Sequence, residues 1–401
     1  MQRTTNWWLF WSAASFIIYT YIGFPLILAL RGLLQPKPFK RGQETPLVSL
    51  IIVAFNEAPV IIKKLDNACA LDYPRDRLEI IVASDGSDDG MNELVAAYDA
   101  PQIRLLVLPR QGKNRSLNAA VAAAQGEILV FSDADSMLAP DALRHLVAPF
   151  ADPAIGGVGG NFCYATNANE GTGEQAYWNI DRVLKQLQSR AENMTSATGQ
   201  IYAIRRALFK PVPMSVTDDF YTSVQVVSAH RRLVFEPLAV ARGPVAASSN
   251  AEFHRKVRVM TRGLNGVRLS SHLLNPFQYG FFAIQLLSHK VLRRLMAIPL
   301  FMLAATAPLL WARGRFYRIA TLLQFGLHGA ALVGLLARET RIGKLKIFSL
   351  PFFFDMVNIA SLVAATNVLR GKRQDVWVTQ RAAVEDVAAN QSQNGQGLHR
   401  Q

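Results

Sequence analysis

Short apolar runs alternate with amphipathic stretches along the middle of the chain, from residue 43 to about residue 245. The run from Leu47 to Ala54 is almost wholly apolar, as expected for a strand buried on both faces of a parallel sheet. Strands that alternate with helices predict an α/β domain with a mostly parallel sheet and helices on both faces. Further strands are expected at residues 78–83, 103–108 and 127–131, and helices at residues 58–70, 91–99, 116–124 and 220–230.

A longer apolar segment precedes this middle part. Residues Trp7 to Leu30 carry no charge, and the segment is long enough to cross a bilayer. Only Arg3 precedes the segment and most basic residues follow it, which favours a retained anchor over a cleaved signal peptide. By the positive-inside rule, the chain from residue 31 onward is then expected in the cytoplasm.

Several apolar runs also follow the middle part. The eleven residues from Phe277 to Leu287 suit a helix in the membrane interface better than a span. Three spans would leave the C-terminus outside, whereas Arg370 and Lys372 favour a tail on the inside, so the number of crossings stays open. The tail after Val387 is rich in Gln, Asn and Gly and is expected to be disordered. The expected spans cover residues 295–312, 318–337 and 347–368.

These patterns divide the 401 residues into five parts, and composition agrees with a membrane protein. Half of the residues are hydrophobic, and the net charge is +14, much of it beside the apolar segments. Such placement suits an anionic leaflet, and no nucleic-acid-binding module is recognisable. The parts are an anchor and linker (1–42), a cytoplasmic α/β domain (43–245), amphipathic interface helices with an Arg-rich segment (246–292), C-terminal transmembrane helices (293–371) and a polar tail (372–401).

The two cysteines, Cys69 and Cys163, form neither a metal motif nor a disulfide framework. We interpret both as small buried hydrophobic residues.

Polar residues follow the expected strands where a parallel sheet places its ligands, at the carboxyl ends. Asn56 and Glu57 follow the first strand, Asp85 the second, and Asp133 and Asp135 the fourth. Two carboxylates one residue apart can share Mg²⁺ or Mn²⁺, with water and substrate phosphates filling the remaining positions. Each motif has a simpler alternative, because such residues also cap helices and build turns.

Basic residues suited to phosphate occur in two further places. Lys113 follows the third strand and can neutralise a phosphate or remain a solvated loop lysine; the glycine spacing around it does not fit a Walker loop. Arg255, Arg258 and Arg262 share one face of a predicted helix. That face can hold a diphosphate or lie on a membrane surface.

Another acidic motif, Thr217-Asp218-Asp219, precedes the helix expected at residues 220–230. A carboxylate there favours the helix dipole. Asp219 can also act as a general base that takes the proton of an acceptor hydroxyl.

Together these motifs resemble glycosyltransferase family 2, and within it the membrane-integrated cellulose, hyaluronan, chitin and poly-N-acetylglucosamine synthases. The resemblance runs from Pro46 to Arg262. It implies the type-A nucleotide-sugar-binding fold, which is Rossmann-like. It also implies inverting transfer of a sugar from a nucleotide donor, commonly UDP-linked, to a hydroxyl of a polysaccharide or lipid-linked acceptor. The enzyme would lie in the inner (plasma) membrane with its catalytic domain in the cytoplasm.

The resemblance also assigns roles to residues. Asp219 would be the catalytic base, and Asp133 and Asp135 would bind Mg²⁺ or Mn²⁺. The residues expected to bind the nucleotide-sugar donor are Ala54, Asn56, Glu57, Asp85, Lys113, Asp133 and Arg258.

The chain departs from the synthase pattern after the base. The synthases usually carry Gln-x-x-Arg-Trp, with a tryptophan that holds the acceptor sugar, whereas this chain has Arg255 and Val259 beside the retained Arg258. Two alternatives to polysaccharide synthesis therefore stay open: transfer of a single sugar to a lipid acceptor, and a catalytically inactive membrane scaffold. The complete set of carboxylates argues against the scaffold.

Overall fold

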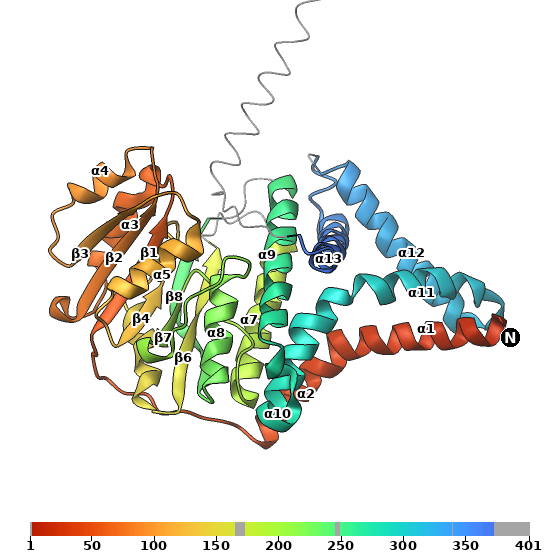
Figure 1. Cartoon of the computed structure of the whole chain (residues 1–401). Helices are drawn as coiled ribbons and strands as arrows, with labels where there is room; N and C mark the ends of the chain where they lie inside the picture. The colour runs from red at the N-terminus through yellow and green to blue at the C-terminus, as the bar shows by residue number, and fades with distance from the viewer. Residues whose placement is uncertain (1, 165–172, 245–248, 339, 373–401) are drawn as a thin grey trace, which may run out of the picture. The chain divides into compact units, whose positions relative to one another are not determined.

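The computed structural model describes residues 2–164, 173–244, 249–338 and 340–372, and these residues fall into two units (Figure 1). The α/β unit contains the described residues of 38–165 and 196–255, and the helical unit contains those of 1–37, 166–195 and 256–373. Neither unit is continuous in sequence. The tail after Val387 lies outside the described residues.

The α/β unit is built on a sheet of eight strands in the order β3-β2-β1-β4-β7-β6-β8-β5 (Figure 1). Strands β3, β2, β1 and β4 run parallel to one another, as the apolar runs predicted. Beyond β4 the sheet is mixed, because β7 is antiparallel to both β4 and β6, β8 is parallel to β6, and β5 is antiparallel to β8. The strands are β1 Val48–Ala54, β2 Leu78–Asp85, β3 Ile103–Leu108, β4 Ile128–Phe131, β5 Met137–Leu138, β6 Ile155–Tyr164, β7 Tyr202–Arg205 and β8 Arg232–Gly243.

The register of the parallel strands aligns their first residues. Val48 of β1 is level with Leu78 of β2 and with Ile128 of β4. The residues that follow β1, β2 and β4 therefore leave the sheet at the same edge, which is the edge where polar residues were predicted to gather.

Helices of the α/β unit follow the strands as predicted, with small differences at their ends. α5 begins at Lys113, three residues earlier than expected, and α8 begins at Asp218, two residues earlier. α6 was not predicted. The helices are α3 Ala58–Cys69, α4 Met91–Ala96, α5 Lys113–Ala123, α6 Ala142–Val147 and α8 Asp218–Ser228, with 3₁₀ turns η2 Arg75–Arg77, η3 Ala148–Ala151 and η4 Arg206–Leu208.

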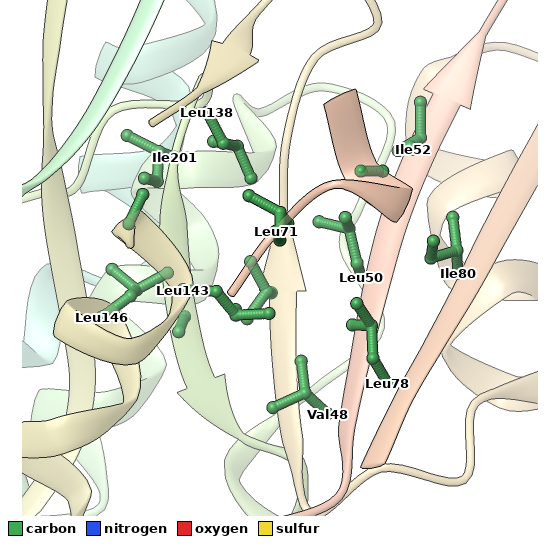
Figure 2. Packing of buried hydrophobic residues seen from close by; sticks show 14 of the residues in the cluster. Val48, Leu50, Ile52, Leu71, Leu78, Ile80, Leu138, Leu143, Leu146 and Ile201 are labelled. Carbon is green, nitrogen blue, oxygen red and sulfur yellow. The ribbon is translucent and has the colours of Figure 1, made fainter. Parts of the chain in front are cut away.

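The core of the α/β unit lies between the sheet and its helices (Figure 2). All seven residues of β1 are buried, so this strand has protein on both faces. Each fully buried Leu, Ile or Val side chain contributes about 1.5–3 kcal/mol to folding. This core fixes the strand ends from which the polar residues project. The residues labelled in Figure 2 are Val48, Leu50, Ile52, Leu71, Leu78, Ile80, Leu138, Leu143, Leu146 and Ile201.

The helical unit contains the apolar segments. α9 starts in the α/β unit and continues into the helical unit, with the boundary between Arg255 and Lys256. The helices are α1 Gln2–Ile18, α2 Phe24–Leu34, α7 Gly173–Ala191, α9 Ser249–Leu269, α10 Pro276–Leu286, α11 Ala297–Leu309, α12 Arg315–Leu336 and α13 Lys346–Leu369. Short helical turns join them: η1 Tyr19–Gly23, η5 Ser271–Leu274, η6 Leu287–Val291, η7 Leu292–Leu295 and η8 Trp311–Arg313.

Three helices among the described residues are long and apolar enough to cross a membrane: Thr4–Leu34, Arg315–Leu336 and Lys346–Leu369. A fourth candidate is a pair, Pro276–Leu295 and Ala297–Leu309, which is bent by 52°. α11 alone has 13 residues, or about 20 Å, which is shorter than the apolar core of a bilayer. The span expected at residues 295–312 therefore exists only as one limb of this bent pair.

The prediction that both cysteines are buried small hydrophobic residues is wrong. Cys69 and Cys163 are free thiols, and both are partly exposed rather than fully buried.

Candidate active site

The acidic pair Asp133 and Asp135 lies in a loop between two strands. Ser132 follows β4 directly and is still tied to β1, because its amide donates to the carbonyl of Ile51 at 3.1 Å. The chain then turns, with the amide of Ser136 donating to the carbonyl of Asp133 at 3.2 Å, and enters β5. Since a strand and not a helix follows the pair, the helix-cap alternative for these two aspartates is wrong.

Lys113 connects this loop to the start of α8. Its Nζ lies 2.8 Å from Oδ1 of Asp133 and 3.3 Å from Oδ2 of Asp218. Burial alone would lower the pKa of Lys113, but the carboxylates of Asp133 and Asp218 raise it above its usual value. Lys113 is therefore a charged residue held between acids, and the alternative of a solvated loop lysine is wrong.

Asp219 lies in the first turn of α8, beside the same loop. Its Oδ1 accepts a hydrogen bond of 2.7 Å from the amide of Phe220. A side chain on Gly199 would come within 3.9 Å of both Oδ2 of Asp133 and Cβ of Asp219, so these two aspartates border one space. The position of Asp219 in the first turn of α8 agrees with the helix-dipole alternative, and its role as a base stays a prediction.

The Asp133–Asp135 pair suits a divalent cation. Burial and the charge of Asp133 raise the pKa of Asp135 above its usual range. A dication would relieve this repulsion. Among the described residues, no group of three His, Cys, Asp or Glu side chains gathers to hold a metal. Two carboxylates are nevertheless a donor set that Mg²⁺ or Mn²⁺ uses when phosphate oxygens and water complete its coordination.

Asp85 is fully buried and shapes the loop before α5. Its Oδ1 accepts from the amides of Gln111 and Gly112, both at 2.9 Å, and from Oγ of Ser116 at 2.8 Å. Its Oδ2 pairs with the guanidinium of Arg110. The carboxylate is thus surrounded by donors of the protein itself, and its assignment to the nucleoside stays a prediction.

Asn56 joins the end of β1 to the turn after β2. It adopts a left-handed conformation, with φ of 52°. Its Nδ2 donates to Oδ1 of Asp88 at 2.8 Å, and its amide donates to Oγ of Ser87 at 3.1 Å. These bonds hold the two strand-end turns together.

Glu57 occupies the N-cap position of α3, but its side chain makes no capping hydrogen bond. Oδ2 of Asp89 instead accepts from the amide of Ala58 at 2.8 Å. Helix capping therefore does not account for a glutamate at position 57. Its side chain is largely buried, at 9% exposure. Ala54, the last residue of β1, is fully buried. The donor-binding roles of Ala54, Asn56 and Glu57 stay predictions.

The arginine stripe lies on α9. Arg262 is 8% exposed, and Arg255 and Arg258 are partly buried. The stripe is therefore not fully exposed to solvent, and its two alternatives, a diphosphate site and a membrane-surface face, stay predictions. Arg258 belongs to the helical unit, and its role toward the donor phosphates stays a prediction.

Sequence reasoning missed Lys64, a fully buried lysine of α3. Its Nζ donates to Oγ of Ser132 at 2.7 Å and to the carbonyl of Ser136. Burial lowers the pKa of Lys64 to about 7, against the opposing effect of the charges on Asp133 and Asp135. One signal was available, because Lys64 lies within the apolar stripe of its helix.

Residues 49–212 match the family described as Glycosyl transferase family 2. The chain contains a glycosyl transferase family 2 domain. The match covers Lys113 and the Asp133–Asp135 pair, and it ends before Asp219.

Several known proteins with similar sequences carry the names of glycosyltransferases or glycolipid synthases. The chain is 29% identical over 199 residues to the beta-monoglucosyldiacylglycerol synthase of Trichormus variabilis, covering 46% of this chain and 42% of that protein. It is 29% identical over 221 residues to the probable glycosyltransferase YdaM of Bacillus subtilis, covering 51% of this chain and 52% of that protein. The chain thus spans about half the length of the relatives it matches.

A solved structure resembles more of the chain than the family 2 domain alone. It is the mannosyltransferase PcManGT from Pyrobaculum calidifontis, in complex with GDP-Man and Mn²⁺. The TM-score is 0.68 at 25% identity, covering 91% of this chain and all of that one. The expected type-A nucleotide-sugar fold, flanked by apolar helices, is confirmed.

Proposed function

We propose that this protein is a membrane-bound inverting glycosyltransferase that moves a sugar from a nucleotide-sugar donor to an acceptor hydroxyl. One observation carries the proposal. Lys113 lies between Asp133 and Asp218, while Asp133 and Asp219 border the same space beside Gly199. This arrangement supports a proposed cation site, phosphate-binding lysine and base acting together, as transfer from a sugar diphosphate requires.

The donor diphosphate is bound by Lys113 and by a divalent cation that the acidic pair holds. Asp133 and Asp135 would hold Mg²⁺ or Mn²⁺, and a divalent cation there stabilises the charge that develops on the leaving diphosphate. The Lys113 ammonium is held beside Asp133, where it adds positive charge for the phosphates. Arg258 is proposed as a second phosphate ligand. The mannosyltransferase solved with GDP-Man and Mn²⁺ supports this donor class, while the sequence resemblance favours a UDP-linked sugar.

Asp219 is proposed as the general base. Its carboxylate takes the proton of the acceptor hydroxyl as the oxygen attacks the anomeric carbon. The bond from that carbon to the diphosphate breaks on the opposite side, so the configuration inverts. Asp219 lies in the first turn of α8, where a helix N-terminus favours a carboxylate, which supports this assignment.

The acceptor is proposed to be a polysaccharide or a lipid-linked molecule at the inner membrane, reached from the cytoplasm. Transfer of one sugar to a lipid without polymerisation is the second candidate. Two observations favour this second candidate. Some relatives are named as glucosyldiacylglycerol synthases. This chain also has Val259 at the position where the polysaccharide synthases usually carry tryptophan. Analysis of product size separates the two, since a single transfer gives one product and polymerisation gives a ladder.

An Asp219→Asn variant tests the assignment of the base. Purified full-length protein in detergent is supplied with radiolabelled UDP- and GDP-sugars, membrane lipid extract and Mn²⁺. We expect kcat/KM for transfer to fall by about 10²–10⁴-fold because general-base catalysis is lost, while donor binding remains. Asp76→Asn, at a side chain that is 81% exposed, is the matched control and should leave transfer unchanged. Full transfer activity in Asp219→Asn would remove Asp219 as the base.

A further inference from the structure

A buried lysine lies beneath the loop that carries the acidic pair. We call residues 132–136 the acidic loop. Lys64 of α3 is 0% exposed, and its Nζ donates to Oγ of Ser132 at 2.7 Å and to the carbonyl of Ser136. One side-chain nitrogen thus binds both ends of the acidic loop.

A second residue of the same helix holds the chain just beyond the loop. Asn67 lies one turn after Lys64, and its Nδ2 donates to the carbonyl of Leu138 at 2.8 Å. Its Oδ1 accepts from the amide of Leu138, also at 2.8 Å. Side chains of α3 therefore fix the path of the chain from Ser132 to Leu138.

The same contacts reach the turn beside the candidate base. Oγ of Ser132 accepts from Lys64 and donates to the carbonyl of Gln200 at 3.1 Å. Gln200 follows Gly199, whose position borders both Asp133 and Asp219. Lys64, Ser132 and Gln200 thus form a chain of hydrogen bonds from α3 to the centre of the site.

Packing alone does not explain a lysine at this position. Ile61, Leu65 and Ala68 on the same face of α3 are each 0% exposed and apolar. Burying an ammonium group costs several kcal/mol unless hydrogen bonds and charges compensate. Methionine is similar in length and would fill the same volume without that cost. Part of the compensation comes from the hydrogen bonds to Ser132 and Ser136 and from the charges of Asp133 and Asp135. Burial nevertheless outweighs those charges and lowers the pKa of Lys64 to about 7.

We propose that Lys64 is a positioning residue for the metal site. By binding Ser132 and Ser136, it fixes the acidic loop so that the carboxylates of Asp133 and Asp135 are aimed at one cation. Lys64 itself touches neither cation nor substrate in this proposal, which rests on the proposed function.

The decisive measurement is Mn²⁺ binding to the purified full-length protein in detergent by titration calorimetry. The Asp133→Asn variant is measured first, and loss of the heat of Mn²⁺ binding in this variant establishes that the ion binds at the acidic loop. In Lys64→Met we expect the dissociation constant for Mn²⁺ to rise tenfold or more, with a thermal midpoint at or above that of the unaltered protein. Lys63→Met is the matched control, because Lys63 is the exposed neighbour on the same helix, and it should bind Mn²⁺ normally.

Kinetics distinguish positioning from general damage to the fold. If Lys64 acts through the cation, Lys64→Met should need more Mn²⁺ for half-maximal transfer but recover most of its kcat when Mn²⁺ is saturating. An unchanged dissociation constant in folded Lys64→Met, or a loss of kcat that Mn²⁺ does not restore, would overturn the proposal.

Ser132→Ala is a milder variant that decides the question if Lys64→Met does not fold. This variant removes one of the two acceptors of the Lys64 side chain and keeps the bond to the carbonyl of Ser136. We therefore expect the dissociation constant for Mn²⁺ to rise by only about threefold. An unchanged dissociation constant would overturn the proposal. The binding measurement does not depend on transfer. Normal Mn²⁺ binding without any sugar transfer would refute the proposed function and leave the role of Lys64 intact.

Discussion

At residue 199 the absence of a side chain leaves room between two carboxylates. A methyl group on Gly199 would lie 3.9 Å from Oδ2 of Asp133 and from Cβ of Asp219, which are ordinary van der Waals distances. The backbone there does not have the positive φ that would exclude other residues. Alanine can therefore be accommodated by the fold, but it would occupy space that the diphosphate and the acceptor are proposed to share.

This leads to a prediction for Gly199→Ala. We expect a thermal midpoint close to that of the unaltered protein and a fall in kcat/KM of about tenfold to a hundredfold, because displacements of about 1 Å in an active site have effects of that size. The measurement combines a thermal melt with the labelled-donor assay. Gly329→Ala in α12, where a methyl group meets open space, is the control. Unchanged transfer in Gly199→Ala would show that the proposed space is not used.

Residues of the site differ in how far sequence alone could find them. Asp133 and Asp135 were found because they follow a buried strand, and Asp219 because it precedes a helix. The approach of Asp133 and Asp218 to Lys113 depends on the positions of α5 and α8 in the fold, which local sequence does not record. Lys64 was missed because a lysine on an apolar stripe gains a meaning only when its hydrogen-bond partners are known.

Among the elements, the parallel strands were predictable and the mixed part of the sheet was not. β1, β2 and β4 are buried on both faces and therefore appear in sequence as continuous apolar runs. β6 contains four glycines and therefore lacks such a run. These glycines allow close packing, because a Cβ atom on Gly160 would lie only 2.7 Å from the carbonyl oxygen of Ala239. The sequence signal for β6 is thus weak for the same reason that β6 packs closely against its neighbour.

α7 carries a buried ion pair in the helical unit. Nζ of Lys185 lies 2.9 Å from Oδ2 of Asp181, one turn earlier on the helix. His289 of η6 approaches Oδ1 of the same aspartate at 3.8 Å. Burial alone would raise the pKa of Asp181, but the charge of Lys185 holds it well below its usual range. The ion pair itself lies within α7, and the approach of His289 brings η6, an element distant in sequence, next to it.

We predict that breaking this pair is costly. Asp181→Asn should lower the free energy of unfolding by about 3–5 kcal/mol, because it leaves Lys185 buried without its charge partner. Lys185→Met should have a similar effect, and the double variant should lose less than the sum of the two. Chemical unfolding in detergent measures all three, and strictly additive losses would contradict the prediction.

The pH dependence of the same pair follows from the depressed pKa of Asp181. Its stabilisation is fully present above the unfolded pKa of about 4 and is lost as the pH falls toward the lower folded value. The difference between the unaltered protein and Asp181→Asn should therefore be largest at neutral pH and shrink below about pH 4.

At the scale of the whole molecule, the candidate active-site residues and the candidate membrane spans belong to different units. The acidic residues and Lys113 belong to the α/β unit, whereas the candidate spans and the Asp181–Lys185 pair belong to the helical unit. A ligand that binds only the folded protein stabilises it by about 2.7 kcal/mol when its concentration is a hundred times its dissociation constant. Donor binding should therefore be visible as a change in stability even when no acceptor is known.

The last prediction uses this linkage to separate a transferase from a scaffold. We expect Mn²⁺ with a suitable nucleotide sugar to raise the thermal midpoint of the purified protein by several degrees, and EDTA to abolish the rise. A variant with both Asp133→Asn and Asp135→Asn should show no rise, because its acidic loop cannot hold the cation. Asp181→Asn should melt earlier yet gain the same increment, since its defect lies outside the donor site. If UDP- and GDP-sugars leave the midpoint of the unaltered protein unchanged at saturating Mn²⁺, the scaffold alternative replaces the enzyme.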